Sequence, residues 1–327
     1  MDFLAIGGTV VDTFIRLKDA EVHCDPDGEN CIISMRYGDK IPFEFSKVVP
    51  GVGNSANAAV AAARLGLSSA LITGLGKDRA GEDCLATFKR ENVSTDFILM
   101  KEGEETMNNF VLWYGPDRTI LVKYSDFGYE LPNPFPKPRV LYISSVGEAN
   151  VGVHDILVDW LEKNPETLLA FQPATFQIQA GIERLARVYA RTNIFICNKE
   201  EYQHILATTE EDPKKLMELM RTHGPKIVFL TDGPNGAYAL SDDGAWKIGL
   251  YPDLRPAYER TGAGDAFAST VTAALLLGKP VQEALRWGPI NSMSVVQKIG
   301  AQEGLLSREE IEKYLREAPA EYTVSPI

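Results

Sequence analysis

The sequence predicts an α/β fold with a doubly wound, mostly parallel central sheet flanked by helices, together with a small separate β-sheet. Short apolar runs without polar alternation, such as VLYIS at 140–144, are typical of strands buried on both faces of a parallel sheet. Helical stretches lie between several of these runs. Two further segments contain hairpin patterns with turn-rich centres, which predicts the small sheet.

Predicted strands and helices alternate along the larger unit. FLAIG, at residues 3–7, ends in glycines, as a strand does where it meets a ligand crevice. An Ala-rich helix is predicted at 55–65 and stops at Gly66. The other predicted strands are SALIT, VLYIS, TLLAF, NIFIC and KIVFL, and the other predicted helices are 152–163, 178–191, 213–223, 265–277, 281–287 and 307–316. This alternation predicts βαβ units.

The small sheet is predicted from two insertions. AEVHC and CIISM flank the turn-rich residues 25–30, and NFVLW and TILVKY flank residues 115–118. The predicted division is an α/β core of residues 1–13, 49–100 and 127–327 and a β lid of residues 14–48 and 101–126.

Composition excludes several classes of protein. The 327 residues are 45% hydrophobic and 24% charged, which is typical of a globular protein and not of a disordered or fibrous one. A formal charge of -12 argues against nucleic acid and anionic membranes as partners. The four cysteines lack C-x-x-C spacing, so we expect reduced thiols. With no signal peptide and no apolar run near 18 residues, the sequence predicts a cytoplasmic protein.

The most informative motif is Thr261-Gly262-Ala263-Gly264-Asp265, which opens an apolar helix. Glycines let backbone N–H groups converge at a helix N-terminus, where they attract an anion such as phosphate. Asp265 then has two interpretations, a helix cap or a general base beside the phosphate. Composition alone favours the cap.

A second glycine cluster, residues 51–57, precedes the Ala-rich helix. Its two asparagines can donate to and accept from sugar hydroxyls, although a tight loop with an Asx cap has the same pattern. The stretch also matches G-x-G-x-x-A, a loose dinucleotide fingerprint. That fingerprint needs an acidic residue at the end of the next strand, and SALITG ends in glycine. This argues against dinucleotide binding.

Two polar clusters follow predicted strands. Asn198 and Glu201 follow NIFIC, where they are either ligands of hydrated Mg²⁺ or a helix N-cap. Residues 231–236 follow KIVFL and form either a plain turn or a loop beside a nucleotide. Residues 74–81 predict a loop and a helix cap. The sequence contains no P-loop and no G-x-S-x-G elbow.

In order and spacing these motifs resemble the ribokinase-like, PfkB-type family of carbohydrate and nucleoside kinases, whose second signature is D-T-x-G-A-G-D. The resemblance spans nearly the whole chain. The matching landmarks are Asp12, G-N-S-A-N at 53–57, G-L-G-K-D-x-x-G at 74–81, N-x-x-E at 198–201, T-x-G-x-x-G at 231–236, T-G-A-G-D at 261–265 and G-A-Q at 300–302. The chain departs from the family pattern at Val52, at Glu259-Arg260 and at residues 171–174.

The resemblance implies a role for each matching residue. Asp265 would be the general base, and Gly262, Ala263 and Gly264 would form the anion hole. The residues implied to bind substrate hydroxyls are Asp12, Gly53, Asn54, Asn57 and Glu148. Those implied to bind the nucleotide are Asn198, Thr231, Gly233, Gly236 and Asn291, with Glu201 as the metal residue. The implied cofactors are ATP, Mg²⁺ and a monovalent cation (K⁺), and the implied assembly is a homodimer through the lid.

The predicted function is an ATP- and Mg²⁺-dependent kinase that phosphorylates an alcohol group of a small sugar or sugar derivative. A nucleoside kinase of the same fold is the alternative within this class. An NAD-dependent oxidoreductase that uses residues 51–56 and a non-catalytic sugar-binding protein are the alternatives from other classes.

Overall fold

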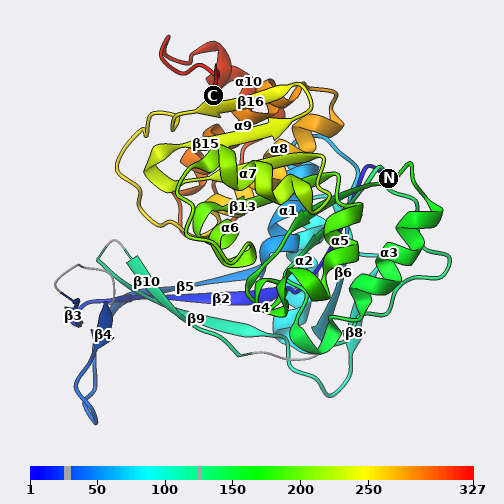
Figure 1. Cartoon of the computed structure of the whole chain (residues 1–327). Coiled ribbons are helices and arrows are strands. Elements are labelled where there is room, and N and C mark those ends of the chain that lie inside the picture. Colours follow the sequence, from blue (N-terminus) through cyan, green and yellow to red (C-terminus); the bar gives the residue numbers. More distant parts are fainter. Residues whose placement is uncertain (26–30, 116, 124–126) are drawn as a thin grey trace.

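The computed structural model describes residues 1–25, 31–115, 117–123 and 127–327, and its centre is a large twisted sheet (Figure 1). Within that described part the sheet has eleven strands, parallel except for one antiparallel edge formed by β15, β16 and β17. In spatial order the strands are β17 (Ser325–Pro326), β16 (Gly244–Ile248), β15 (Ala237–Ser241), β14 (Ile227–Thr231), β13 (Ile194–Asn198), β12 (Leu168–Gln172), β11 (Val140–Ser144), β1 (Phe3–Ile6), β6 (Ser69–Gly76) and β7 (Val93–Ser94), with β8 (Ile98–Lys101) also beside β6. The predicted doubly wound, mostly parallel sheet is confirmed.

Helices cover both faces of this sheet, so each strand contributes alternate side chains to two cores. In β1, Phe3 and Ala5 belong to one core, and Leu4 and Ile6 belong to the other. The first core is completed by α1 (Asn54–Arg64), α2 (Arg79–Arg90), α8 (Ala263–Leu276), α9 (Val281–Val295) and α10 (Arg308–Arg316). The second is completed by α3 (Val153–Lys163), α4 (Thr175–Arg184), α5 (Ala186–Arg191), α6 (Lys199–Ile205) and α7 (Pro213–Thr222).

Three helices differ from their predicted extents. α9 continues past Pro289, because buried Trp287, Ile290 and Met293 hold this segment against the first core. The helix predicted at 178–191 is two helices that meet at Leu185. α2, predicted only as a cap, is a full helix that begins after Asp78, whose carboxylate accepts from the Gly81 amide.

A separate four-stranded sheet projects from the core (Figure 1). Its order is β10 (Asp117–Leu121), β9 (Asn108–Tyr114), β2 (Val10–Leu17) and β5 (Phe43–Val52). We call this the lid sheet. AEVHC and CIISM were predicted to belong to it, but among the described residues β3 (Glu21–His23) and β4 (Ile32–Ser34) pair only with each other, at its far end. β2 and β5 also run through the predicted boundaries at residues 13 and 48.

The expectation of four reduced cysteines is wrong. Cys24 and Cys31 form a disulfide, because the β3–β4 hairpin brings the two residues that flank its turn face to face. The turn itself, residues 26–30, lies outside the described part of the chain. Cys84 and Cys197 are buried free thiols. Across the described residues, every helix is too short or too polar to cross a bilayer.

Candidate active site

The candidate site lies at the carboxyl ends of the parallel strands, where the N-termini of α1 and α8 meet them. Ser55, in the first turn of α1, places its hydroxyl 2.7 Å from the Ile6 carbonyl oxygen and 2.9 Å from that of Ser144. This contact fixes the start of α1 against β1 and β11. Ligands of open α/β sheets bind at this edge, so the polar side chains there are the candidates.

The turn before α8 needs glycine at position 262. Gly262 has φ +83°, and a Cβ there would lie 2.3 Å from the Ala301 Cβ. Both the backbone angle and the space therefore exclude a side chain. The Thr261 amide and hydroxyl donate to the Glu259 carboxylate at 2.8 and 2.6 Å, which fixes the other side of the turn.

The backbone amides of this turn are available to a ligand. Among the described residues, the N–H groups of Gly262, Gly264 and Asp265 donate to no protein acceptor, and that of Ala263 makes only a 3.5 Å contact with the Arg260 carbonyl. Together with the positive end of the helix dipole, these donors are suited to bind an anion. Of the three amides predicted to form an anion hole, those of Gly262 and Gly264 are unused by the described protein, and that of Ala263 makes only this long contact.

Asp265 lies in the first turn of α8, but it does not cap the helix. Its Oδ2 accepts from Asn57 Nδ2 at 2.8 Å, and its Oδ1 accepts from Gln172 Nε2 at 3.0 Å. Both donors come from other elements, so the cap interpretation is wrong. Burial raises the pKa of Asp265, and these two hydrogen bonds oppose that rise. A carboxylate with a raised pKa beside an anion site suits a general base.

Asp265 lines one of three neighbouring cavities. The central one, of about 200 Å³, is lined by Asp265, the 262–264 turn, Arg118 and Glu201. A cavity of about 690 Å³ adjoins it below the lid sheet and shares Asn54 and Glu201 with it. A third, of about 430 Å³, shares Thr231, Arg260, Ala263 and Gly264 with the central cavity. We call them the central, lid-side and distal cavities.

The lid-side cavity contains three of the five predicted substrate residues. Gly53, Asn54 and Glu148 line it. Asn57 is almost fully buried and bonds Asp265 instead of facing this cavity. Asp12, on β2, is also buried.

Asp12 is paired with a residue that the sequence analysis missed. Asn109 Nδ2, on the neighbouring strand β9, donates to Asp12 Oδ1 at 3.0 Å. Burial raises the Asp12 pKa to about 6, opposed by this hydrogen bond and by Arg118. The Asn109 Oδ1 atom is buried, and no described residue donates to it, although Asn109 lines the lid-side cavity. Asn109 is therefore a further candidate for holding a substrate hydroxyl.

The lid sheet brings a positive charge to the central cavity. Arg118, on β10, lies 3.6 Å from the carboxylate of Glu259, whose side chain is 1% exposed. Glu259 Oε2 also accepts from the Gly300 amide at 3.3 Å. Glu259, where the chain departs from the family pattern, thus connects the lid sheet to the turn at residues 261–264.

Asn198 and Glu201 form a capping box at the start of α6. The Glu201 amide donates to Asn198 Oδ1 at 2.8 Å, and the Asn198 amide donates to Glu201 Oε2 at 3.0 Å. Both line the central cavity, so capping leaves them within reach of a ligand there. Burial raises the Glu201 pKa. No group of three metal-ligating side chains occurs in the ranges that the structure describes.

The distal cavity receives most of the predicted nucleotide residues. Thr231, Gly233 and Gly236 line it, together with the apolar side chains of Leu250, Tyr251, Phe267, Pro289, Met293 and Val296. Asn291 does not line this cavity. Its side chain is fully buried, donates to Thr270 Oγ1 at 2.8 Å and accepts from the Leu306 amide at 2.9 Å. Asn291 joins α8, α9 and the following loop.

A model of the pfkB family of carbohydrate kinases matches residues 40–308. An "Uncharacterized sugar kinase" of Archaeoglobus fulgidus is 25% identical over 251 residues, 74% of this chain and 96% of that protein.

Two solved structures share the fold. The nucleoside kinase of Methanocaldococcus jannaschii superimposes with a TM-score of 0.77 at 18% identity, over 97% of this chain and 99% of that one. The Arabidopsis thaliana ribokinase, solved with ribose and ATP, gives a TM-score of 0.76 at 16% identity, over 96% of this chain and 98% of that one.

Proposed function

Because this chain belongs to the pfkB family of carbohydrate kinases, we propose that it transfers the γ-phosphoryl group of ATP to an alcohol group of a small sugar or sugar derivative. Family membership makes it a kinase and removes the oxidoreductase and the non-catalytic alternative. The acceptor, the donor and the roles of the residues are what we propose.

One observation carries the proposed mechanism. The Asp265 carboxylate and three amides without an acceptor among the described residues line the central cavity, which the lid-side and distal cavities adjoin. An acceptor in the lid-side cavity and a triphosphate in the distal cavity would bring a hydroxyl and a phosphoryl group together there. Asp265 would take the hydroxyl proton, and the amides of residues 262–265 would stabilise the charge on the transferred group.

The lining of the distal cavity suits ATP. Its apolar walls suit a purine, and Thr231, Gly233 and Gly236 are suited to contact the ribose and phosphates. Arg260 lines both the distal and the central cavity and has no ion pair within the described chain, so it is available to the phosphates. Mg²⁺ usually binds through one or two carboxylates, substrate phosphates and water. Glu201 and Asn198 would hold it, and it would neutralise phosphate charge.

K⁺ activation is the least supported of the proposed cofactor requirements. Glu259 already accepts from Thr261 and Gly300 and faces Arg118, which leaves it little negative charge to offer a cation. We therefore expect equal rates in potassium chloride and choline chloride. A marked fall in choline chloride would contradict this expectation.

The lid-side cavity also favours a second candidate acceptor, a nucleoside. At about 690 Å³ it has room beyond a single sugar ring, and Phe127, Tyr129 and Phe176 line it. Aromatic walls suit a base attached to a ribose.

A homodimer through the lid sheet is the proposed assembly. Val48, Thr13, Phe110 and Leu121 are cross-strand neighbours that form one row over β5, β2, β9 and β10. Val48 is 61% exposed, Phe110 43% and Leu121 52%, so the row forms an apolar strip on the outer face. If the strip mediates dimerisation, Phe110→Asp gives a monomer by sedimentation where the parent sediments as a dimer. A monomeric parent would contradict this proposal.

The proposed activity is tested by ADP release from the purified chain with ATP and Mg²⁺. The acceptors are pentoses, hexoses, sugar acids, sugar phosphates and nucleosides, each compared with ATP alone. We expect at least one acceptor to raise ADP release well above the ATP-only rate. Failure of every acceptor, with ATP binding intact, would contradict the proposal.

A further inference from the structure

Each oxygen of Asp265 accepts a hydrogen bond from a side-chain amide, one from Asn57 and one from Gln172. A side-chain amide has nearly the same shape when its oxygen and nitrogen are exchanged. Whether it presents N–H or C=O to Asp265 therefore depends on what its other end contacts. In both cases the other end contacts a hydrogen-bond donor.

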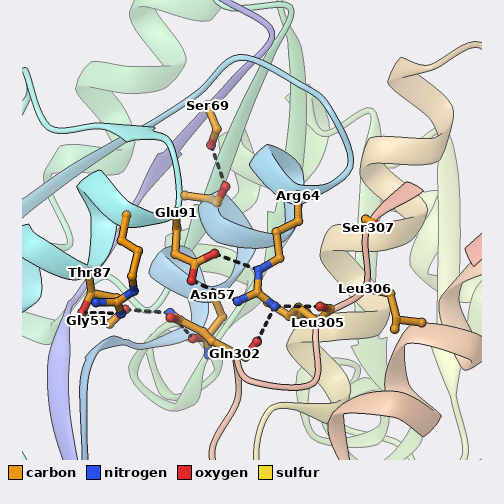
Figure 2. A network of polar contacts seen from close by, with 12 residues as sticks. Gly51, Asn57, Arg64, Ser69, Thr87, Glu91, Gln302, Leu305, Leu306 and Ser307 are labelled. Atoms are coloured by element: carbon orange, nitrogen blue, oxygen red, sulfur yellow. Dashed lines mark hydrogen bonds and ion pairs between the residues drawn. The ribbon is translucent and has the colours of Figure 1, made fainter. Parts of the chain in front are cut away.

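For Asn57 the donor is Gln302, a buried residue on the loop after α9. Gln302 Nε2 donates to the Gly51 carbonyl oxygen at 2.7 Å and to Asn57 Oδ1 at 3.0 Å (Figure 2). A backbone carbonyl can only accept, so Gly51 requires the NH₂ end of Gln302. The same NH₂ group of Gln302 also donates to Asn57, so Asn57 must present its oxygen to Gln302. The NH₂ group of Asn57 must then face Asp265.

For Gln172 the donor is Tyr142, on the adjacent strand β11. The Tyr142 side chain is fully buried, and its hydroxyl donates to Gln172 Oε1. A buried hydroxyl that loses the acceptor for its single hydrogen is destabilised. Tyr142 therefore requires the oxygen of Gln172, and the NH₂ group of Gln172 faces Asp265.

The loop that carries Gln302 is itself fixed. Arg64 Nη1 donates to the carbonyl oxygens of Gln302 and Leu305 at 2.9 and 2.6 Å, and Arg64 Nε donates to Glu91 at 2.8 Å (Figure 2). The ion pair with Glu91, at the end of α2, is only partly exposed and fixes the Arg64 side chain that holds the loop. Gln302 is thus held on its backbone as well as on its side chain.

We propose that Gln302 and Tyr142 are positioning residues, which set the direction of the two amides so that both donate to Asp265 and hold it ready to accept the substrate's proton. This inference rests on the proposed role of Asp265 as general base. Each carboxylate oxygen keeps a further lone pair for that proton. Neither positioning residue needs to touch the substrate.

Kinetics of three variants test the inference. Gln302→Met removes the donor without adding charge, and we expect kcat to fall about tenfold. In Gln302→Glu the new carboxylate accepts from the NH₂ group of Asn57, so Asn57 turns its oxygen to Asp265. We expect kcat to fall roughly 10- to 100-fold. Tyr142→Phe frees Gln172 to turn, with an expected loss of about tenfold. The KM for ATP stays within about twofold in all three.

Matched controls separate positioning from general packing. Gln297 is also buried, but it bonds Arg255. The Tyr189 hydroxyl is buried without a partner among the described residues. Gln297→Met and Tyr189→Phe should keep the parental kcat. Thermal unfolding checks that every variant is folded. Equal losses of kcat in the controls would overturn the inference.

A second readout needs no substrate, so it tells failure of this inference apart from failure of the proposed function. Carboxyl NMR of ¹³C-Asp protein, assigned with Asp265→Asn, follows the titration of Asp265. The charged and titratable groups around it are Asp12, Tyr142 and Glu201, which interact with it electrostatically, and Arg118 and Arg260, which line the same cavity. Loss of an N–H donor removes a contact that lowers the pKa, so we expect a higher Asp265 pKa in Gln302→Met and Tyr142→Phe.

In an active enzyme the acid limb of kcat/KM moves to higher pH with the Asp265 pKa. If the parent protein is inactive but the Asp265 pKa still rises in Gln302→Met and Tyr142→Phe, the proposed function is refuted and the positioning role of Gln302 and Tyr142 is supported. If the Asp265 pKa changes only in Gln302→Glu, the cause is the added charge, and the inference is overturned. Unchanged titration in both neutral variants would overturn it too.

Discussion

Replacing Gly262 by alanine tests the turn that carries the anion site. The new Cβ would lie 2.3 Å from the Ala301 Cβ and 2.5 Å from its Cα, at a backbone φ of +83°. The left-handed backbone costs about 1–2 kcal/mol for a residue with a Cβ, and the overlap costs about 1–3 kcal/mol more. The free energy of unfolding should therefore fall by roughly 2–5 kcal/mol, about 1.5 °C in Tm for each kcal/mol. Displacement of the amides should lower kcat roughly 100-fold.

Gly278 provides the matched control. It has φ +79°, yet a Cβ there would meet no heavy atom within 4 Å. In Gly278→Ala the free energy of unfolding should fall only by the cost of the left-handed backbone, about 1–2 kcal/mol, and kcat should stay at the parental value. Thermal unfolding and ADP release on both variants give the comparison. If Gly262→Ala is no less stable and no less active than Gly278→Ala, the account of this turn is refuted.

Two further predictions concern buried polar residues. The Asp12 pKa is raised to about 6 from 3.8, so ionising this carboxyl destabilises the fold as pH rises through that window. Asp12→Asn should raise the free energy of unfolding at pH 8 by up to about 3 kcal/mol, with the gain vanishing towards pH 4; a gain that does not depend on pH would contradict this. Asn291→Ala removes bonds to Thr270 and Leu306, so it should lower stability by about 1–3 kcal/mol and leave the KM for ATP unchanged. A large rise in that KM would return Asn291 to the nucleotide site.

The fold was predictable because its strongest signals are local. Apolar runs such as VLYIS and KIVFL become β11 and β14, since burial on both faces requires a continuous apolar sequence. The lid sheet was harder to predict. The assignment of AEVHC failed because a hairpin pattern shows that two strands pair with each other and not which sheet they join. The end of α9 was missed because tertiary packing overrides Pro289.

The candidate site was predictable only in part. The turn at 262–265 is contiguous in sequence, so its glycines and its carboxylate were visible together. Gln172, Asn109 and Arg118 reach the site from β12, β9 and β10, and no local pattern marks them. The sequence held one signal for them. Gln172, and Glu259 as the ion-pair partner of Arg118, stand where the chain departs from the family pattern. Asn291 joins two helices outside the distal cavity, and no spacing in the sequence distinguishes an asparagine with that role.

Asp265→Asn tests the central claim most directly. Asparagine keeps the size of the side chain but removes the base, so the rate of phosphoryl transfer to the best acceptor should fall roughly 100- to 10,000-fold while the purified protein still binds ATP. A variant that transfers phosphate as fast as the parent would show that Asp265 does not accept the substrate's proton.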